Sequence, residues 1–93
     1  MNTAHKGRRA EHRARMMLVA DGYVVVRAAG SKGPADLVAW DSGRFLILSV
    51  KSGGRYLSSL ERAAFAAVPV PPGGQREIWR FLDRCLAPVI ERL

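Results

Sequence analysis

A predicted β-hairpin in the middle of the chain constrains its fold more than any other feature. Two apolar segments, residues 35–40 and 44–51, flank Ser42-Gly43, a two-residue turn of the kind that joins adjacent antiparallel strands. A register closed at this turn pairs Val38 with Ile47 and fixes every other pair along the two strands. The sequence therefore predicts two neighbouring strands whose facing side chains follow from the register.

One face of this hairpin carries polar side chains at its open end. Because side chains alternate with a period of two, Asp36 is expected opposite Ser49, with Lys51 further along the same face. Carboxylates at both facing positions would form a pocket for a hard divalent cation, and the nearby lysine would stabilise the charge that develops during phosphodiester hydrolysis. The chain supplies the aspartate and the lysine but has a serine in place of the second carboxylate. The hairpin is thus a candidate metal-dependent nuclease site with one weakened ligand.

The segments before the hairpin predict a helix and a further strand. A helix over residues 7–20 ends at Asp21-Gly22, and a valine-rich strand over residues 23–28, expected to be buried on both faces, leads to a turn at residues 30–33. The inner side of this helix is assigned to Ala10, Ala14, Met17 and Leu18.

The segments after the hairpin complete an α/β fold with the element order α-β-β-β-α-β. Ser58 and Glu61 form a capping box that opens a second helix, which Pro69 stops before a loop. The expected core positions of this helix are Leu60, Ala64, Phe65 and Val68. Residues 77–82 favour a strand because aromatic and β-branched side chains are frequent there, and a short final helix is expected from about Pro88.

Composition favours one small domain that binds a polyanion. The 93 residues suffice for a single domain, and 15 basic against 8 acidic side chains give a net charge of +7. Twelve of the basic residues are arginine, which binds phosphate bidentately, although a GC-rich genome would also enrich arginine. The single cysteine, Cys85, excludes an internal disulfide, and no apolar stretch approaches the roughly 18 residues of a membrane span. A soluble, cytoplasmic protein is expected.

Size also favours self-association. A domain of this length buries only about 60 to 65% of its unfolded surface, so pairing with a second copy would stabilise it. Phe65, Trp79 and Phe81 are expected either in the core or in the interface of such a homodimer.

Several of these residues occur in an order that resembles the PD-(D/E)XK nuclease superfamily. The pattern comprises Glu11, Arg27-Ala28-Ala29-Gly30-Ser31, Pro34-Ala35-Asp36 and Ser49-Val50-Lys51. Within the superfamily the chain is most similar to the archaeal-type Holliday junction resolvases, which also occur in phages. Two positions depart from the family: Ser49 replaces the glutamate of E-x-K, and His12 stands where arginine is common.

The resemblance implies a restriction-endonuclease-like αβββαβ core with a central mixed β-sheet flanked by helices. It also implies a homodimer that cuts branched double-stranded DNA at four-way junctions, with Mg²⁺ as the cofactor and Mn²⁺ as its substitute. The implied catalytic residues are Glu11, Asp36, Ser49 and Lys51, and the implied metal ligands are Asp36, Ser49, the Val50 carbonyl and Glu11. Charge and resemblance together predict DNA contacts by Lys6, Arg8, Arg9, His12, Arg15, Arg27, Ser31, Lys32 and Arg55.

Ser49 leaves the expected activity open, because a neutral hydroxyl binds a cation more weakly than a carboxylate. Three explanations compete: an engineered inactive variant, a natural site that relies on Glu11, and a nuclease fold that now only binds DNA. The retention of Lys51 favours an engineered or strongly impaired resolvase. The alternative functions are a repair or restriction-like nuclease of the same fold, acting on duplex or flapped DNA, and a non-catalytic basic DNA-binding domain.

Overall fold

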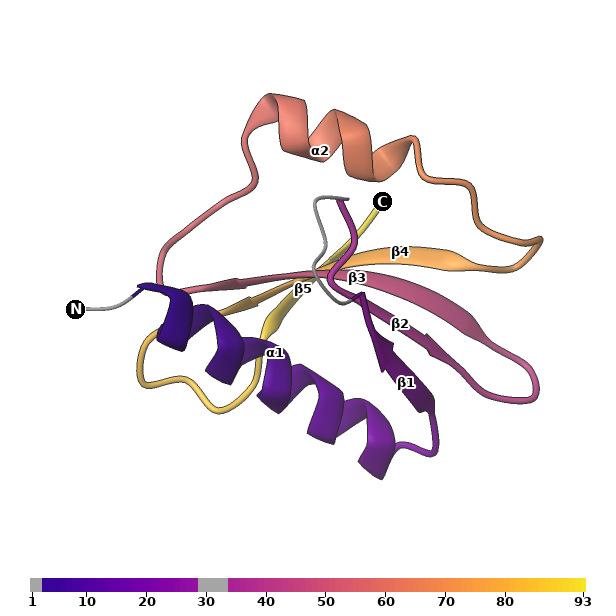
Figure 1. Ribbon diagram of the computed structural model, residues 1–93, viewed down its shortest axis with the longest axis horizontal. Coiled ribbons are helices and arrows are strands. Elements are labelled where there is room, and N and C mark those ends of the chain that lie inside the picture. Colours follow the sequence, from indigo (N-terminus) through magenta and orange to yellow (C-terminus); the bar gives the residue numbers. More distant parts are fainter. Residues whose placement is uncertain (1–2, 29–33) are drawn as a thin grey trace.

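The computed structural model describes residues 3–28 and 34–93, with side chains from residue 7 onward. In this part of the chain, a five-stranded sheet lies between two helices (Figure 1). The elements are α1 (Thr3–Ala20), β1 (Val24–Arg27), β2 (Leu37–Trp40), β3 (Phe45–Ser52), α2 (Ser59–Ala66), β4 (Gln75–Phe81) and β5 (Val89–Arg92). The sheet has the order β1-β2-β3-β4-β5, with β3 and β4 parallel and the other neighbours antiparallel. The predicted α/β class and mixed sheet are confirmed, and one strand is added at the end.

The predicted hairpin forms with the predicted register. Val38 lies opposite Ile47 in the pairing of β2 with β3. At the turn, the Asp41 carboxylate accepts the backbone N–H groups of the residues that follow, Gly43 and Arg44. The predicted turn at Gly30 to Gly33 lies outside the residues that the structure describes.

The register extends one residue beyond β2. The Asp36 N–H donates to the Leu48 carbonyl at 2.7 Å, which continues the antiparallel pairing and places Asp36 opposite Ser49. The side chain of Asp36 therefore lies on the face of the sheet that carries Ser49 and Lys51.

Helix α1 covers one face of the sheet. Ala10, Ala14 and Leu18 are buried against it, in a line with a spacing of four residues. Met17, predicted to share this inner side, is 37% exposed because it lies at the margin of that line. The helix ends as predicted at Gly22, whose positive φ of 92° permits the left-handed turn that L side chains disfavour.

Helix α2 lies over the opposite face, as Figure 1 shows. Ser58 and Glu61 form the predicted capping box. Phe65 packs with Ile47 and Ile78 in a second core and is 0% exposed. The predicted core positions Leu60 and Ala64 are wrong, because this short helix packs on the sheet through its C-terminal turn and leaves its other side chains in solvent.

The valine-rich strand β1 is an edge strand, and the prediction that it is buried on both faces is wrong. Val25 packs against the core on the α1 side, whereas Val24 and Val26 face outward and are about half exposed. Helix α2 packs over β3 and β4 through Ile47 and Ile78, so it does not cover β1.

The predicted final helix is also wrong, because residues 89–92 form β5. Val89 and Ile90 are β-branched and pair antiparallel with Arg80 and Trp79 of β4. Within the strand pair, the buried carboxylate of Glu77 accepts hydrogen bonds from the Trp79 indole and the Arg92 guanidinium. Pairing with β4 thus outweighs the local sequence pattern that predicted a helix in the last residues.

Trp79 and Phe81 are buried in the core on the α1 side, so the sequence alternative that places them in the core is correct. Arg13 ties α1 to the loop after β4: its guanidinium donates to the Cys85 and Leu86 carbonyls and lies 4.6 Å from the centre of the Phe81 ring. Neither of the described helices has the length and apolar character needed to cross a membrane.

Candidate active site

The hairpin brings three of the predicted catalytic residues to one cavity. Asp36 precedes β2, Ser49 and Lys51 alternate along β3, and all three line a cavity of about 280 Å³ on the α2 side of the sheet. The rest of the lining comes from Pro34 and from α2 with its preceding loop: Leu57, Leu60, Glu61 and Ala64. The cavity therefore contains the predicted hairpin face together with one further carboxylate, that of Glu61.

The Asp36 carboxylate is fixed by the backbone of β3. Its Oδ2 accepts the Val50 N–H at 2.7 Å, and no hydrogen bond to its Oδ1 occurs within the described residues. Because the N–H and C=O of one strand residue point to the same side, the Val50 carbonyl also points toward Asp36. Two oxygen atoms that could bind a cation, Oδ1 and this carbonyl, thus lie on the same side of the strand.

The charges around Asp36 act on its ionisation. Burial raises the pKa of the Asp36 carboxyl, and the hydrogen bond from the Val50 N–H opposes that shift. The Glu11 carboxylate raises this pKa further, the Lys51 ammonium lowers it, and the Glu61 carboxylate raises it. Asp36 therefore lies within electrostatic reach of two other carboxylates, and a divalent cation beside it would offset their repulsion.

Lys51 and Glu61, which both line the cavity, form an ion pair. The Lys51 Nζ is 3.4 Å from the Glu61 Oε2, while the Glu61 Oε1 accepts the Ser58 N–H at 2.9 Å. The Ser58 hydrogen bond, followed by the Lys51 charge, lowers the pKa of the Glu61 carboxyl, so this group is ionised at neutral pH. The sequence interpretation assigned Glu61 only to the capping box and missed its place in the cavity.

Glu11 lies apart from this cavity. It lines a separate hollow of about 210 Å³ on the α1 side, with Arg8, His12, Arg15, Arg27 and Leu37. The Glu11 Oε1 is 3.4 Å from the Arg27 Nε. The predicted group of four catalytic residues is thus divided, with Asp36, Ser49 and Lys51 in one cavity and Glu11 in the next.

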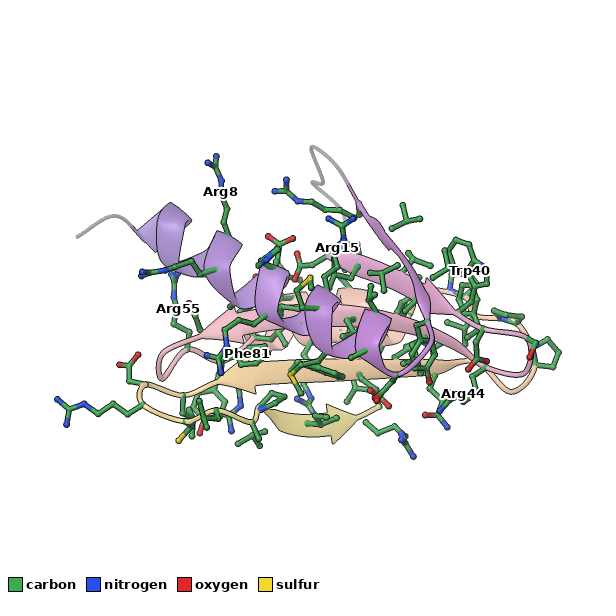
Figure 2. All side chains as sticks on the ribbon, turned by 90° about the horizontal axis from the view of Figure 1, so that it is seen from below. Arg8, Arg15, Trp40, Arg44, Arg55 and Phe81 are labelled. Atoms are coloured by element: carbon green, nitrogen blue, oxygen red, sulfur yellow. The ribbon has the colours of Figure 1, made fainter. Side chains whose placement is uncertain are left out.

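The basic residues predicted to contact DNA also divide into groups. Figure 2 shows Arg8 and Arg15 on the same side of α1, where they share the hollow of Glu11 with His12 and Arg27. Arg9 lines another hollow together with Arg13 and Arg84.

The remaining predicted DNA contacts lie in a loop or in parts of the chain where no side chains are described. Arg55 is exposed in the loop after β3. Lys6 lies in α1, where only the backbone is described, and Ser31 and Lys32 lie outside the described residues. Their predicted role in DNA binding stays a prediction.

The residues of the cavity fit a lightly held Mg²⁺ better than an enclosed metal. Among the described residues, no three His, Cys, Asp or Glu side chains come together in a group that could hold an ion. Mg²⁺ in proteins typically keeps several waters and binds through one or two carboxylates and the phosphates of its substrate. Asp36 with the Ser49 hydroxyl and the Val50 carbonyl meets that requirement. The roles of these side chains stay predictions.

A larger hollow, of about 570 Å³, lies at the hairpin turn and does not resemble a catalytic site. Its carboxylate, Asp41, is bound to the Arg44 guanidinium at 2.6 Å. Asp41 is therefore occupied in closing the turn.

Comparison with known proteins identifies the family. The sequence profile of the archaeal Holliday junction resolvases, Hjc, matches residues 2–65, well over half of the 93 residues. The chain belongs to this family. A solved structure of the Hjc protein from Archaeoglobus fulgidus, a Holliday junction resolvase from an archaeal hyperthermophile, superposes with a TM-score of 0.77. It is 26% identical in sequence, and the match covers 92% of this chain and 76% of that chain.

A comparison with curated protein sequences finds no match. The Hjc family and its α/β nuclease fold nevertheless confirm the predicted superfamily and the main functional prediction, a Holliday junction resolvase. This Hjc chain accordingly has the fold of a nuclease, with the hairpin of β2 and β3 at the centre of its candidate active site.

Proposed function

We propose that this Hjc chain is a Mg²⁺-dependent endonuclease that cuts four-way DNA junctions at the cavity between β3 and α2. The observation that carries the proposal is the shared cavity of Asp36, Ser49 and Lys51 in a chain of the resolvase family. A carboxylate, a hydroxyl and an ammonium group in one cavity match the needs of phosphodiester hydrolysis, where negative charge develops on the phosphate.

The cation would be held by Asp36 through Oδ1, by the Ser49 hydroxyl and by the Val50 carbonyl. When bound, Mg²⁺ supplies a polarised phosphate oxygen and an acidified water, and Mn²⁺ can replace it because both prefer oxygen ligands. The hydrogen bond from the Val50 N–H keeps the Asp36 carboxylate in place before substrate arrives. Lys51 lines the cavity from β3, and its ammonium would stabilise the charge that develops on the phosphate.

The arginine-rich hollow on the α1 side supplies the proposed DNA contacts. Arg8, Arg15 and Arg27 would bind backbone phosphates, with His12 beside them. These contacts provide affinity, and the geometry of the branch provides selectivity. A two-fold homodimer would present two such sites to the symmetry-related strands of a junction.

The proposed function is tested by offering the unaltered chain a four-way junction, a linear duplex with the same arm sequences and the single strands. Cleavage of the junction should require Mg²⁺ or Mn²⁺ and stop in the presence of a chelator. Because two dimer-related sites act on two strands, the cuts should fall at symmetric positions. Light scattering of the protein alone should give twice the chain mass of 10.2 kDa.

Each alternative outcome has a definite meaning. Equal cleavage of duplex and junction would favour a repair or restriction-like nuclease of the same fold. Tight junction binding without cleavage in either metal would favour a DNA-binding domain. A monomer that makes a single cut would contradict the two-site arrangement.

Removing two arginines from the α1 side should weaken DNA binding and its dependence on salt. For each phosphate that the protein no longer neutralises, the slope of log affinity against log salt becomes shallower by roughly 0.9. Arg8→Ala with Arg15→Ala should therefore flatten the slope by about two, for junction and duplex alike. Fluorescence anisotropy at several salt concentrations measures this slope.

Arg44 provides the matched control for this experiment. Figure 2 shows it at the hairpin end of the molecule, away from Arg8 and Arg15, and its guanidinium is paired with Asp41. Arg44→Gln should leave the slope unchanged. A slope that changes with Arg44 and ignores the α1 pair would place the DNA path elsewhere.

A further inference from the structure

The active-site cavity contains a carboxylate that the hairpin pattern does not account for. Glu61, in the first turn of α2, lines the cavity together with Asp36, Ser49 and Lys51. The three hairpin residues come from β3 and from the residue before β2, whereas Glu61 enters the cavity from α2. The cavity therefore has one acidic group from the hairpin and one from α2, and Lys51 of β3 is paired with the second.

On the hairpin side of the cavity, Ser49 stands where a second carboxylate would complete a cation site. The residue as a whole is 2% exposed and lines the cavity, and its hydroxyl makes no hydrogen bond within the described residues. In the described part of the chain, every fully buried side-chain nitrogen or oxygen atom has a hydrogen-bond partner, so the unbonded Ser49 hydroxyl must reach the open space of the cavity. A hydroxyl that lines a polar cavity without a protein partner is available to a ligand in that cavity, such as a cation or its bound water.

Glu61 is held in an orientation that suits such a ligand. Its Oε1 accepts the Ser58 N–H, so the capping box fixes the side chain at the start of α2. The other oxygen, Oε2, is turned toward the Lys51 ammonium at 3.4 Å. One oxygen thus positions the group, while the second faces the positive charge of Lys51, which also lines the cavity.

Glu11, the carboxylate that the sequence pattern offered as a compensating ligand, lies outside the cavity of Ser49 and Lys51. It lines the hollow on the α1 side and is paired with Arg27. Glu11 raises the pKa of the Asp36 carboxyl more than Glu61 does, but only Glu61 shares the cavity that Ser49 and Lys51 line. The shared cavity, together with the pairing of Glu11 with Arg27, favours Glu61 as the partner of Asp36.

We propose that Glu61 supplies the second carboxylate of the divalent-cation site, in place of the one that Ser49 does not provide. The inference rests on the proposed metal-dependent nuclease function and adds a ligand to that same site. A carboxylate on the α2 wall completes a pair with Asp36 without requiring one on β3. In this arrangement Ser49 is a natural feature of a working site, which differs from the engineered or impaired form that the sequence pattern favoured.

The main alternative is that Glu61 serves only the capping box, and one substitution separates the two roles. Glutamine at the third helical position also completes a capping box, but it has no negative charge. Glu61→Gln should therefore keep the thermal unfolding midpoint of the metal-free chain while lowering Mn²⁺ affinity about tenfold or more, since affinity follows the number of charged ligands. Calorimetric titration of the full chain with Mn²⁺ measures this affinity without DNA or turnover.

Returning a carboxylate to β3 should reverse the loss. Ser49→Glu combined with Glu61→Gln should restore Mn²⁺ affinity and junction cleavage, whereas Ser49→Glu alone should change both far less. Ser49→Asp offers a shorter carboxylate should glutamate destabilise the fold. Glu91→Gln, on a glutamate paired with Arg62 outside the cavity, is the matched control and should leave Mn²⁺ affinity unchanged.

The possible failures can be told apart. If Glu61→Gln binds Mn²⁺ and cleaves like the unaltered chain while Asp36→Asn loses both, the role of Glu61 is wrong and the proposed function stands. The same conclusion follows if adding Ser49→Glu restores Mn²⁺ affinity and cleavage to the Glu11→Gln variant but not to the Glu61→Gln variant. If Asp36→Asn also binds Mn²⁺ like the unaltered chain, the metal site itself is wrong, and both proposals fail.

Discussion

Asparagine in place of Asp36 should lower the rate of junction cleavage by about 10³-fold or more. A bound metal contributes several kcal/mol of transition-state stabilisation, and each 1.4 kcal/mol corresponds to about tenfold in rate. Asparagine has nearly the same shape and can still accept the Val50 N–H, so the hairpin should remain intact. Junction affinity should be nearly unchanged, because phosphate contacts come from the α1 side. Single-turnover cleavage and anisotropy measure the two quantities.

Asp41 offers the matched substitution in the same hairpin. It lies at the turn, where its carboxylate caps Gly43 and Arg44, outside the cavity that contains Asp36. Asp41→Asn should leave the cleavage rate close to that of the unaltered chain. Equal reductions for both variants would indicate a general effect on the hairpin and would contradict a catalytic role for Asp36.

Truncation of Phe65 to alanine should have the largest effect on stability. This ring is 0% exposed and is the buried contact that α2 makes with Ile47 and Ile78. Removing a buried phenylalanine side chain costs about 3 to 5 kcal/mol, a large share of the roughly 5 to 15 kcal/mol that stabilises a domain. Urea unfolding followed by the fluorescence of the buried Trp79 should show this destabilisation.

Leu60 tests whether the effect depends on burial. It belongs to the same helix and is 82% exposed, so Leu60→Ala should change the free energy of unfolding by less than about 0.5 kcal/mol. Comparable destabilisation by the Leu60 and Phe65 variants would mean that α2 packs on the sheet through a different face.

The local parts of this fold could be predicted because short-range physics fixes them. A turn residue pair and a period of two are sufficient to set the register that places Asp36 opposite Ser49. The capping box of Ser58 and Glu61 follows in the same way from a spacing of three residues. In these elements the structure and the sequence pattern agree residue by residue.

The errors concern features that distant parts of the chain decide. Whether Val24 and Val26 are covered depends on which strands α2 packs against, which their own sequence does not contain. The last segment is a strand because β4 has an edge open to it and Glu77 receives Arg92, not because of its periodicity. Propensity is a weak guide for four residues when such pairing is possible.

In the candidate site, too, the locally determined residues could be predicted and the residue that depends on distant contacts could not. The hairpin side chains were found from spacing, whereas Glu61 reaches the cavity from α2 and was assigned only its local role. A signal was nevertheless present: a missing carboxylate at Ser49 and a glutamate ten residues after Lys51, at the start of a helix. Sequence alone could not show that α2 folds back over the same end of β3, since that placement depends on Phe65 and its distant partners.

The central claim is that the cavity of Asp36, Ser49, Lys51 and Glu61 binds the metal that hydrolysis requires. It is tested most directly by titrating Mn²⁺ into the unaltered, ¹⁵N-labelled chain and following the amide signals by NMR. A paramagnetic ion in the cavity should broaden the signals of Val50, Lys51 and Glu61 first, while that of Asp41 at the hairpin turn persists. Broadening that spares those three amides, or that affects all exposed carboxylates equally, would contradict the claim.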